Sequence, residues 1–197
     1  GGHNWHPMAF NHKAGLVYIP ALVNSYIYDT PEIFKYLPGP FWNTGNIDVR
    51  DQTDIMDQLP PKLVKKLAKK MFNGRLIAWD PVAQQERWSI EHPTMWNGGI
   101  LTTSAGLVFQ GTGDGRFVAY DADTGAVLWQ SETATGVVAP PISYKIDGVQ
   151  YIAVMAGWGG TAALFNLPNA KSAKNGRLLV YKLGGKGVLP TATDKPE

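Results

Sequence analysis

Short apolar runs separated by glycine-containing turns make up most of the sequence. Residues 14–18 (Ala-Gly-Leu-Val-Tyr) resemble residues 105–109 (Ala-Gly-Leu-Val-Phe), and residues 150–154 have a similar apolar character. These runs have the length of strands and are rich in β-branched and aromatic residues, which favour extended structure. The pattern predicts a chain built almost entirely from short β-strands.

A second set of predicted strands repeats at a regular interval. Residues 74–80 (Gly-Arg-Leu-Ile-Ala-Trp-Asp) match residues 115–121 (Gly-Arg-Phe-Val-Ala-Tyr-Asp) at an offset of 41 residues, and residues 175–181 form a shorter third copy. A repeat of about 40 residues that contains several short strands is typical of a β-propeller, whose four-stranded blades pack face to face. We therefore expect about three blades within residues 1–183.

The turns and tryptophans of the repeat support this interpretation. Asp114-Gly115 and Thr124-Gly125 can supply the positive φ that tight hairpin turns require. Trp88 and Trp129 each follow the repeat's aspartate by eight residues. We expect their large flat rings to stack between neighbouring blades.

One stretch departs from the strand pattern. Residues 43–72 are polar and then lysine-rich, and Leu63, Leu67 and Met71 recur at helical spacing. We expect an insertion that carries a short amphipathic helix, packed on the propeller with its lysines in solvent, rather than a membrane-surface or partner-docking helix. Residues 184–197 are small and polar, and we expect a linker or tail.

Composition and charge exclude several classes of function. The formal charge is +2 with 17% charged residues, which gives little support to nucleic-acid binding. The chain has no cysteine, so it has no disulfide, no thiolate metal site and no C-x-x-C-H attachment site for haem c. It has no apolar run of membrane-spanning length and no signal-peptide pattern at residues 1–7, so we expect a soluble, mature or truncated segment.

Few residues suggest chemistry on their own. His3, His6 and His12 could be imagined as metal ligands, but no carboxylate lies nearby in the sequence, and we interpret them as ordinary hydrogen-bonded histidines. We interpret the remaining candidates as turn or hairpin residues rather than a calcium loop or a phosphate cradle: Asp114, Asp121, Asp123 and the glycine-rich residues 111–115.

Two clusters are harder to explain as turns alone. Residues 96–99 read Trp-Asn-Gly-Gly, and residues 157–161 read Gly-Trp-Gly-Gly-Thr. Each joins an aromatic surface to glycines that permit a close approach of the backbone. Both clusters are therefore candidates for contact with a flat ligand.

At these residues the chain resembles the alcohol dehydrogenases that depend on pyrroloquinoline quinone (PQQ), including the quinohaemoprotein types. The opening residues 1–21, with their Gly-Gly-x-Asn-Trp-x-Pro core, and residues 95–160 are similar to segments of that family. The resemblance spans about residues 1–183. It implies that the chain is the C-terminal part of an eight-bladed propeller tied by tryptophan-docking motifs, with PQQ and calcium near the axis.

The resemblance also implies particular contacts with the cofactor. Asn4 and the backbone of Trp5 would contact PQQ, and Gly160 with Thr161 would border its carboxylate end. Trp96 would line or support the same site. Chemically, the amide of Asn4 could donate to a quinone oxygen, and backbone N–H groups can bind carboxylates without a counter-charge.

The same resemblance implies that essential parts lie outside this chain. The family's calcium ligands, its catalytic aspartate, its cationic residue near the quinone and its pair of adjacent cysteines belong to earlier blades. We therefore assign no catalytic residue and no metal ligand here. Oxidation of an alcohol needs a positioned base and a Lewis acid, so we expect the chain alone to be inactive.

The expected function is that of a piece of a periplasmic dehydrogenase that oxidises primary alcohols to aldehydes. Its expected partners are the remaining N-terminal blades, the alcohol, and a cytochrome c domain or protein as electron acceptor. Two alternatives stay open: a sugar dehydrogenase, or a non-catalytic propeller of the same repeat type that acts as a protein-binding scaffold. In the scaffold, Asn4, Trp5 and the two glycine pairs would have no role.

Overall fold

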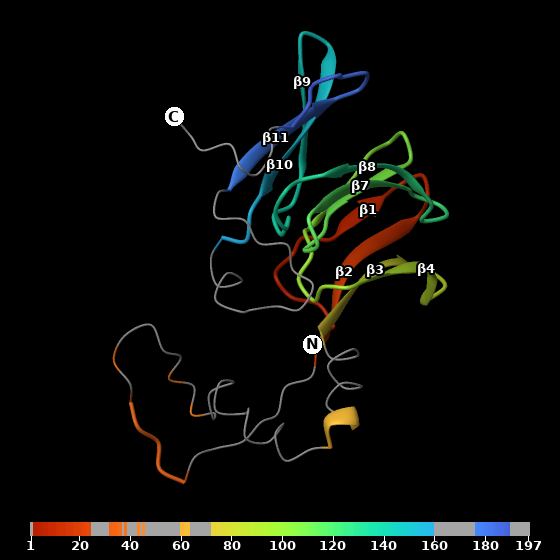
Figure 1. Ribbon diagram of the computed structural model, residues 1–197. Coiled ribbons are helices and arrows are strands. Elements are labelled where there is room, and N and C mark those ends of the chain that lie inside the picture. The colour runs from red at the N-terminus through yellow and green to blue at the C-terminus, as the bar shows by residue number, and fades with distance from the viewer. Residues whose placement is uncertain are drawn as a thin grey trace, which may run out of the picture. The chain divides into compact units, whose positions relative to one another are not determined.

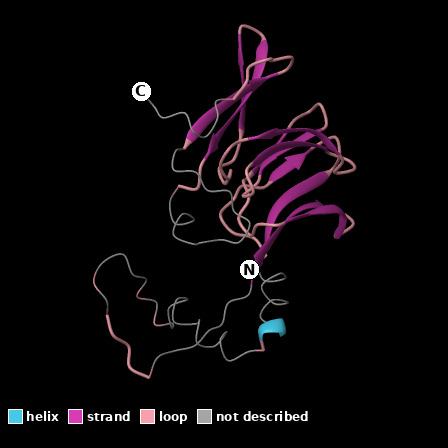
Figure 2. Cartoon of the chain, in the orientation of Figure 1, coloured by secondary structure: helices cyan, strands magenta, loops and turns pink. Residues whose placement is uncertain are grey.

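The computed structural model describes residues 2–24, 32–36, 38, 43, 45, 60–63, 72–159 and 176–189. The chain divides into two compact units, Gly1–Val23 together with Phe72–Glu197, and Asn24–Met71. In the first unit nearly every described element is a strand or a turn (Figure 2). In the second, residues 61–63 form one helical turn.

The strands of the first unit form three sheets that follow one another along the chain (Figure 1). The first sheet has the order β1-β2-β3-β4, the second β5-β6-β7-β8, and the third β11-β10-β9. The bounds of these strands are Ala9–Asn11 (β1), Leu16–Asn24 (β2), Phe72–Asp80 (β3), Gln85–His92 (β4), Ile100–Thr102 (β5), Leu107–Gly111 (β6), Arg116–Asp121 (β7), Val127–Glu132 (β8), Ile142–Ile146 (β9), Val149–Ala156 (β10) and Arg177–Lys182 (β11).

The sequence repeats occupy equivalent places in the three sheets. The runs expected at residues 14–18, 105–109 and 150–154 lie at the second strand of each sheet, in β2, β6 and β10. The three Gly-Arg repeats lie in the third strands, β3, β7 and β11. The repeat in the sequence is therefore a repeat of one antiparallel meander.

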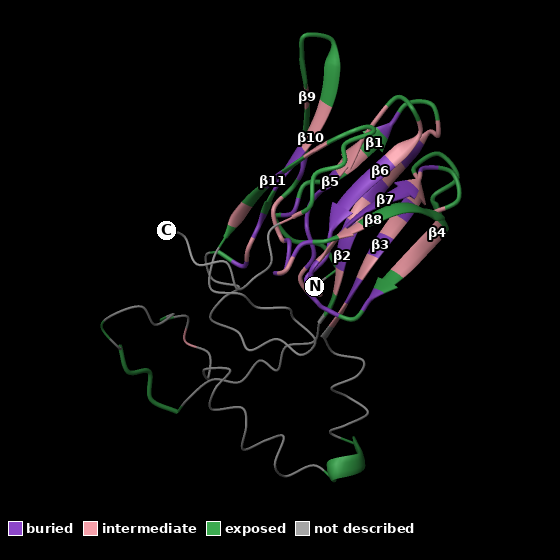
Figure 3. Cartoon of the chain, turned by 45° about the horizontal axis from the view of Figure 1, so that its top comes forward, coloured by how far each residue is buried: buried purple, intermediate pink, exposed green. Residues whose placement is uncertain are grey.

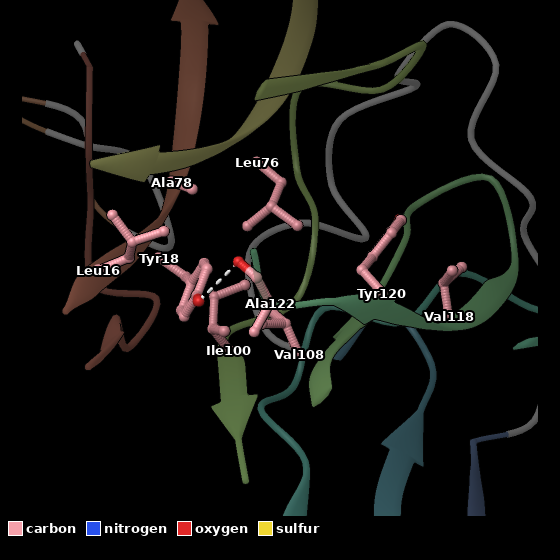
Figure 4. Packing of buried hydrophobic residues seen from close by; sticks show 9 residues of the cluster. All are labelled: Leu16, Tyr18, Leu76, Ala78, Ile100, Val108, Val118, Tyr120 and Ala122. Atoms are coloured by element: carbon pink, nitrogen blue, oxygen red, sulfur yellow. Dashed lines mark hydrogen bonds between the residues drawn. The ribbon is translucent and has the colours of Figure 1, made fainter. Parts of the chain in front are cut away.

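Two apolar clusters join the three sheets in series. One contains residues of the first and second sheets, and the other contains residues of the second and third. The second sheet is thus buried on both faces, which Figure 3 shows as the concentration of purple on β6 and β7. The clusters consist of Leu16, Tyr18, Leu76, Ala78, Ile100, Val108, Val118, Tyr120 and Ala122 (Figure 4), and of Phe109, Phe117, Ala119, Val137, Val154, Ala156 and Leu179.

Tryptophan rings lie at the junctions between sheets. The indole Nε1 of Trp88, on β4, donates to the backbone oxygen of Ala122 at 3.1 Å, and its ring lies against the backbone of Gly125. Trp129, on β8, makes an edge contact with Tyr181 of the third sheet at a centroid distance of 5.2 Å. The repeated tryptophan thus contacts the following sheet in both copies. That these contacts are the tryptophan-docking motif of the resembled family stays an interpretation.

The structure confirms the all-β prediction, and the predicted glycine turns have the expected conformation, with φ of 90° at Gly115 and 74° at Gly125. The insertion expected at 43–72 differs in extent from the separate unit, which runs over Asn24–Met71, while Phe72 already belongs to β3. Residues 64–71 lie outside the described residues, so the helix beyond residue 63 stays a prediction. The same holds for the tail beyond residue 189.

Candidate functional site: a tryptophan stack on the loops between sheets

The candidate site is built from the loops that precede the first strand of each sheet. Residues 3–8 precede β1, residues 93–99 connect β4 to β5, and residues 133–141 connect β8 to β9. Backbone hydrogen bonds tie these loops to one another and to the second sheet: Ile100 N donates to Pro7 O at 2.9 Å, Gly98 N donates to Gly111 O at the end of β6 at 2.8 Å, and Val137 N donates to Thr112 O at 3.0 Å. The loops therefore form one continuous wall across the three sheets.

Glycines make this close packing possible. A Cβ on Gly98 would lie 2.8 Å from the backbone oxygen of Ala139, and one on Gly99 would lie 2.5 Å from the ring of Pro7. A Cβ on Gly111 would lie 2.1 Å from the side chain of Val137. Because real Cβ atoms do not approach so closely, any side chain at these positions would push the loops apart. The glycine pair at 98–99 thus has its first role in packing loop on loop.

Three aromatic side chains gather on this wall. The ring of Trp5 stacks on the ring of Trp96 at a centroid distance of 4.7 Å and an interplanar angle of 30°. The imidazole of His6 lies 5.2 Å from Trp5 and 5.3 Å from Trp96. Trp5 is 64% exposed, whereas His6 is buried. The cluster is therefore a fixed aromatic platform with one ring open to solvent.

The polar atoms of the platform are unequally satisfied. The indole Nε1 of Trp96 is buried and has no hydrogen-bond partner. The backbone N–H of Trp5 donates to Oδ1 of Asn4 at 3.0 Å. A buried donor without a partner costs free energy, commonly about 1–3 kcal/mol, so such atoms point to a ligand or a water that completes the bond. The expected backbone contact from Trp5 would need Asn4 to release that N–H.

The loop that carries Trp96 is fixed by its neighbour Asn97. The Asn97 carboxamide accepts from Gly113 N at 3.0 Å and from Thr94 Oγ1 at 3.0 Å, and donates to Thr94 O at 2.8 Å. Thr94 follows the first sheet and Gly113 lies in the β6–β7 turn of the second. One buried amide thus bonds groups from two sheets next to the platform.

His92 forms a second buried network behind the same loop. Its Nε2 lies 3.0 Å from Oε1 of Gln110, whose Nε2 donates to Gly98 O at 3.1 Å. Since Oε1 can only accept, His92 Nε2 carries the proton and Nδ1 is left without a partner. Burial lowers the pKa of His92, and burial together with nearby His3 lowers the pKa of His6. Both imidazoles are therefore neutral at pH 7.

The other histidines and the aspartates have ordinary structural roles. His3 Nε2 lies 2.9 Å from His6 O, and His12 packs edge-on against Phe10. Asp121 accepts from the backbone of Asp123 and Thr124, and Asp114 pairs with Arg116. Within the described residues, no three His, Asp or Glu side chains are grouped so that they could hold a metal ion. No described helix is long and apolar enough to cross a membrane.

The second glycine cluster is described only in part. Gly160 and Thr161, expected at the carboxylate end of the cofactor, lie outside the described residues. Their neighbours do reach the wall: Gly157 N donates to Gly136 O at 2.8 Å, and the ring of Trp158 covers Gly136. Asn4, Trp5 and Trp96 thus lie together, while the placement of Gly160 and Thr161 stays a prediction.

The sequence of this chain is similar to those of known dehydrogenases. Residues 61–152 match the family model described as glucose/ethanol/alcohol dehydrogenase, beta-propeller domain, of the PQQ type. The chain is 42% identical over its whole length to quinohemoprotein alcohol dehydrogenase ADH-IIG of Pseudomonas putida, and 43% identical over 96% of its length to the quinohemoprotein alcohol dehydrogenase of Comamonas testosteroni. In sequence, the chain is therefore similar to one part of the PQQ-dependent alcohol dehydrogenases.

Solved structures of PQQ dehydrogenases agree in fold. The Pseudomonas putida ADHIIG structure matches the whole chain with a TM-score of 0.80, and the Comamonas testosteroni structure matches 96% of it with a TM-score of 0.74. A europium-containing methanol dehydrogenase matches with a TM-score of 0.65 at 25% identity. The chain spans about a quarter of the length of the two curated relatives, 27% and 26% respectively.

Sequence reasoning missed the residues that fix the platform. Asn97 was noticed only as part of the cluster at residues 96–99, and Gln110 was not singled out, because their bonds are made to residues far away in sequence, such as Gly113 for Asn97. His6 was interpreted as an ordinary hydrogen-bonded histidine, with no place in an aromatic cluster. The available signal was the Asn97 side chain between Trp96 and two glycines, where a small amide could bond the backbone of a tight loop.

Proposed function

We propose that this chain forms part of the PQQ-binding wall of a quinoprotein dehydrogenase that oxidises primary alcohols to aldehydes. The observation that carries the proposal is the buried, unpartnered Nε1 of Trp96 beside the exposed, stacked ring of Trp5. A planar ligand with peripheral oxygen atoms would satisfy both groups, since it offers an acceptor to the indole N–H and a face to the ring. PQQ, the cofactor after which the matching family model is named, is a planar quinone with oxygen atoms at its edge.

The residues of this chain would bind and orient the cofactor rather than perform proton transfer. When bound, PQQ accepts two electrons from the alcohol. Trp96 would donate from Nε1 to an oxygen at the cofactor's edge, and Asn4 would present its amide to another. Trp5 would cover aromatic surface and exclude water. Neutral His6 and His92 contribute no positive charge, so the wall would hold an anionic ligand through hydrogen bonds and ring contacts rather than through these imidazoles.

The remaining machinery would come from the rest of the protein. The relatives are about four times as long as this chain, and none of the described residues is grouped as a metal site. We infer that the calcium ligands, the catalytic base and the other blades lie in the parts that this chain does not contain. We also infer transfer of electrons to a cytochrome c domain or protein, which the quinohemoprotein names of the relatives support. A periplasmic location is part of the same proposal and rests on the resemblance alone.

The test uses the full-length protein, purified without its cofactor and titrated with PQQ. Trp96→Phe keeps a ring but removes the donor, and Asn4→Ala removes the amide. We expect each to raise the dissociation constant for PQQ about tenfold, the effect of losing one hydrogen bond to a charged ligand. Trp129→Phe is the control, because that ring packs on Phe117 and Tyr181, away from the wall.

The outcomes separate the dehydrogenase from the scaffold. Unchanged PQQ affinity in both variants would remove Trp96 and Asn4 from the site. A full-length protein that binds no PQQ at all, and shows no alcohol-dependent reduction of a dye, would favour the non-catalytic propeller. Activity on sugars but not on primary alcohols would favour the sugar dehydrogenase.

A further inference from the structure

Asn97 follows Trp96, whose buried Nε1 has no hydrogen-bond partner among the described residues, and its bonds can control the position of that tryptophan. Asn97 is 3% exposed, and its carboxamide makes three hydrogen bonds to Thr94 and Gly113. The amide is buried, and its three bonds are not made to the rings of the platform. Its bonds instead fix the backbone on either side of Trp96.

The packing around Asn97 leaves this loop little freedom. A Cβ on Gly74 would lie 2.2 Å from Asn97 Nδ2, so β3 presses its backbone against the amide. A Cβ on Gly113 would lie 2.4 Å from the backbone oxygen of Trp96. The backbone around Trp96 is therefore held between Gly74 of β3, in the first sheet, and Gly113 of the β6–β7 turn, in the second.

From this geometry we infer that Asn97 is a positioning residue, which sets the ring of Trp96 against Trp5 by bonding Thr94, in the same loop between β4 and β5, to Gly113 in the β6–β7 turn. Trp96 lies one residue before Asn97 in the chain, so a shift of the Asn97 backbone carries the indole with it. The stack with Trp5, at 4.7 Å, and the direction of the indole N–H both depend on that placement. Residues that orient a binding group from behind it commonly affect affinity about 10–100-fold.

The chain supplies a matched control in Asn11. Its side chain is also 3% exposed, and it also bonds two neighbouring segments, donating to Thr102 Oγ1 at 2.8 Å and to Thr103 O at 3.0 Å. It accepts from the backbone N of Lys13 and Ala14. Asn11 thus makes the same kind of contact between the first and second sheets, but it does not adjoin a residue of the platform.

The experiment is a double-mutant cycle in the full-length protein, with Asn97→Ala, Trp96→Phe and the two combined. We measure the dissociation constant for PQQ, the near-ultraviolet circular dichroism of the cofactor-free protein and its melting midpoint. We expect Asn97→Ala to weaken PQQ binding about tenfold in the parent and to add less than about twofold in the Trp96→Phe background, because both changes act through one indole. Asn11→Ala is expected to lower the melting midpoint but to leave PQQ affinity unchanged in both backgrounds.

Two results would overturn the inference. One is a loss of PQQ affinity from Asn97→Ala that is equally large with and without Trp96, and the other is an unchanged near-ultraviolet spectrum and unchanged affinity in Asn97→Ala. If Asn97→Ala does not fold, Thr94→Val removes the Oγ1 bond while keeping the shape of the side chain, and the same cycle is read with it.

The inference deepens the proposed function, and the two can fail separately. If Trp96→Phe binds PQQ as tightly as the parent, the proposed contact from Trp96 is wrong. The positioning role is then decided by the spectrum alone: it stands if Asn97→Ala changes the near-ultraviolet signal in the parent and not in Trp96→Phe, and it fails if the change is the same in both.

Discussion

At the scale of single residues, two buried tyrosines have a pKa well above the usual range of a phenol. Tyr18 and Tyr120 lie in the cluster between the first and second sheets, and burial raises the pKa of each to about 12. Tyr18 also donates from its hydroxyl to Ala122 O at 2.9 Å (Figure 4). Both side chains are therefore neutral in the folded protein over the whole physiological range.

These phenols make stability depend on pH in the alkaline range. In the unfolded chain they lose their protons near pH 10, whereas in the folded protein they keep them to about pH 12. Above pH 10 the unfolded state binds fewer protons, so the free energy of unfolding falls as pH rises from 10 to 12. We expect Tyr18→Phe to make this fall shallower, measured by urea denaturation at pH 8, 10 and 11. An equally steep fall in the variant would contradict the assignment to Tyr18.

Gly125 offers a second test at this scale. Its φ of 74° disfavours a side chain, and a Cβ would lie 2.8 Å from the ring of Trp88. Gly106 has a similar φ of 81° but open space around it. We expect Gly106→Ala to cost about 1 kcal/mol from the backbone alone, and Gly125→Ala to cost a further 1–3 kcal/mol, roughly, by displacing the indole. Equal costs, measured by denaturant unfolding, would show that Trp88 does not press on this turn.

Residue-level features were predictable from the sequence only where they are local. The positive φ of Gly115 and Gly125 follows from turn chemistry within a few residues, and the structure confirms it. The role of Asn97 depends on Gly113, and that of Gly99 on Pro7, which lies 92 positions earlier. The residues adjacent to Asn97 and Gly99 in the sequence do not predict such contacts with distant parts of the chain.

At the scale of elements, the third sheet has two faces of unequal burial. Val154, Ala156 and Leu179 pack against the second sheet. Register places Met155 opposite Leu178 and Ala153 opposite Val180, so these residues share the other face. Met155, Leu178 and Val180 on this face are between 46% and 63% exposed, and so is Ile142 of β9. The sheet therefore presents a contiguous apolar surface of the kind that marks an interface.

We expect the 197-residue chain, expressed alone, to self-associate through this face. Leu178→Lys places a charge at its centre and should shift the chain towards the monomer in sedimentation velocity, because a charge in an apolar contact is costly. Val82→Lys is the control, since Val82 is 92% exposed in the turn between β3 and β4. A chain that is monomeric at all concentrations, or that responds equally to both substitutions, would contradict the expectation.

The elements themselves were largely predictable, for a physical reason. Each strand of the Gly-Arg repeat is bounded by turn residues, and its apolar residues recur in three copies, so the copies reinforce one another. Short turns account for the pairing of β3 with β4, of β5 to β8 in series and of β9 with β10, but not for the pairing of β2 with β3 or of β10 with β11, which long segments separate. The partner sheets could not be predicted residue by residue, because Phe117 meets Tyr181 only after the sheets have stacked.

At the scale of the whole molecule, the first sheet is continuous across the separate unit. β2 and β3 are neighbours in that sheet although the unit Asn24–Met71 lies between them in sequence. The ends of the unit therefore leave and return at adjacent strands. Long insertions at such places cost little, because the closure entropy grows only slowly with loop length.

We expect replacement of residues 26–69 by a short Asn-Gly hairpin loop to leave the three sheets intact. In the full-length protein, the melting midpoint should change by less than about 1 °C, which corresponds to about 1–2 kcal/mol in a protein about four times as long as this chain. A loss of folded protein would show that the unit stabilises the first sheet. The circular dichroism of the tryptophan stack gives a second readout of whether residues 3–8 still reach residue 96.

The fold could be inferred from the sequence more fully than the site. Repetition reveals the sheets, whereas the platform depends on loops that come from successive sheets. Trp5 and Trp96 are 91 residues apart and meet because their sheets are adjacent. The resemblance to PQQ dehydrogenases predicts that both tryptophans lie at one site, whereas their spacing in the sequence does not.

The oxygen of Ala122 limits the movement of the first sheet relative to the second. It accepts one bond from Tyr18 on β2 and another from Trp88 on β4, two strands apart in the same sheet. Because the two donors reach one oxygen from separate strands, sliding or turning one sheet against the other would lengthen at least one of these bonds. The junction is therefore held by directed contacts as well as by apolar packing.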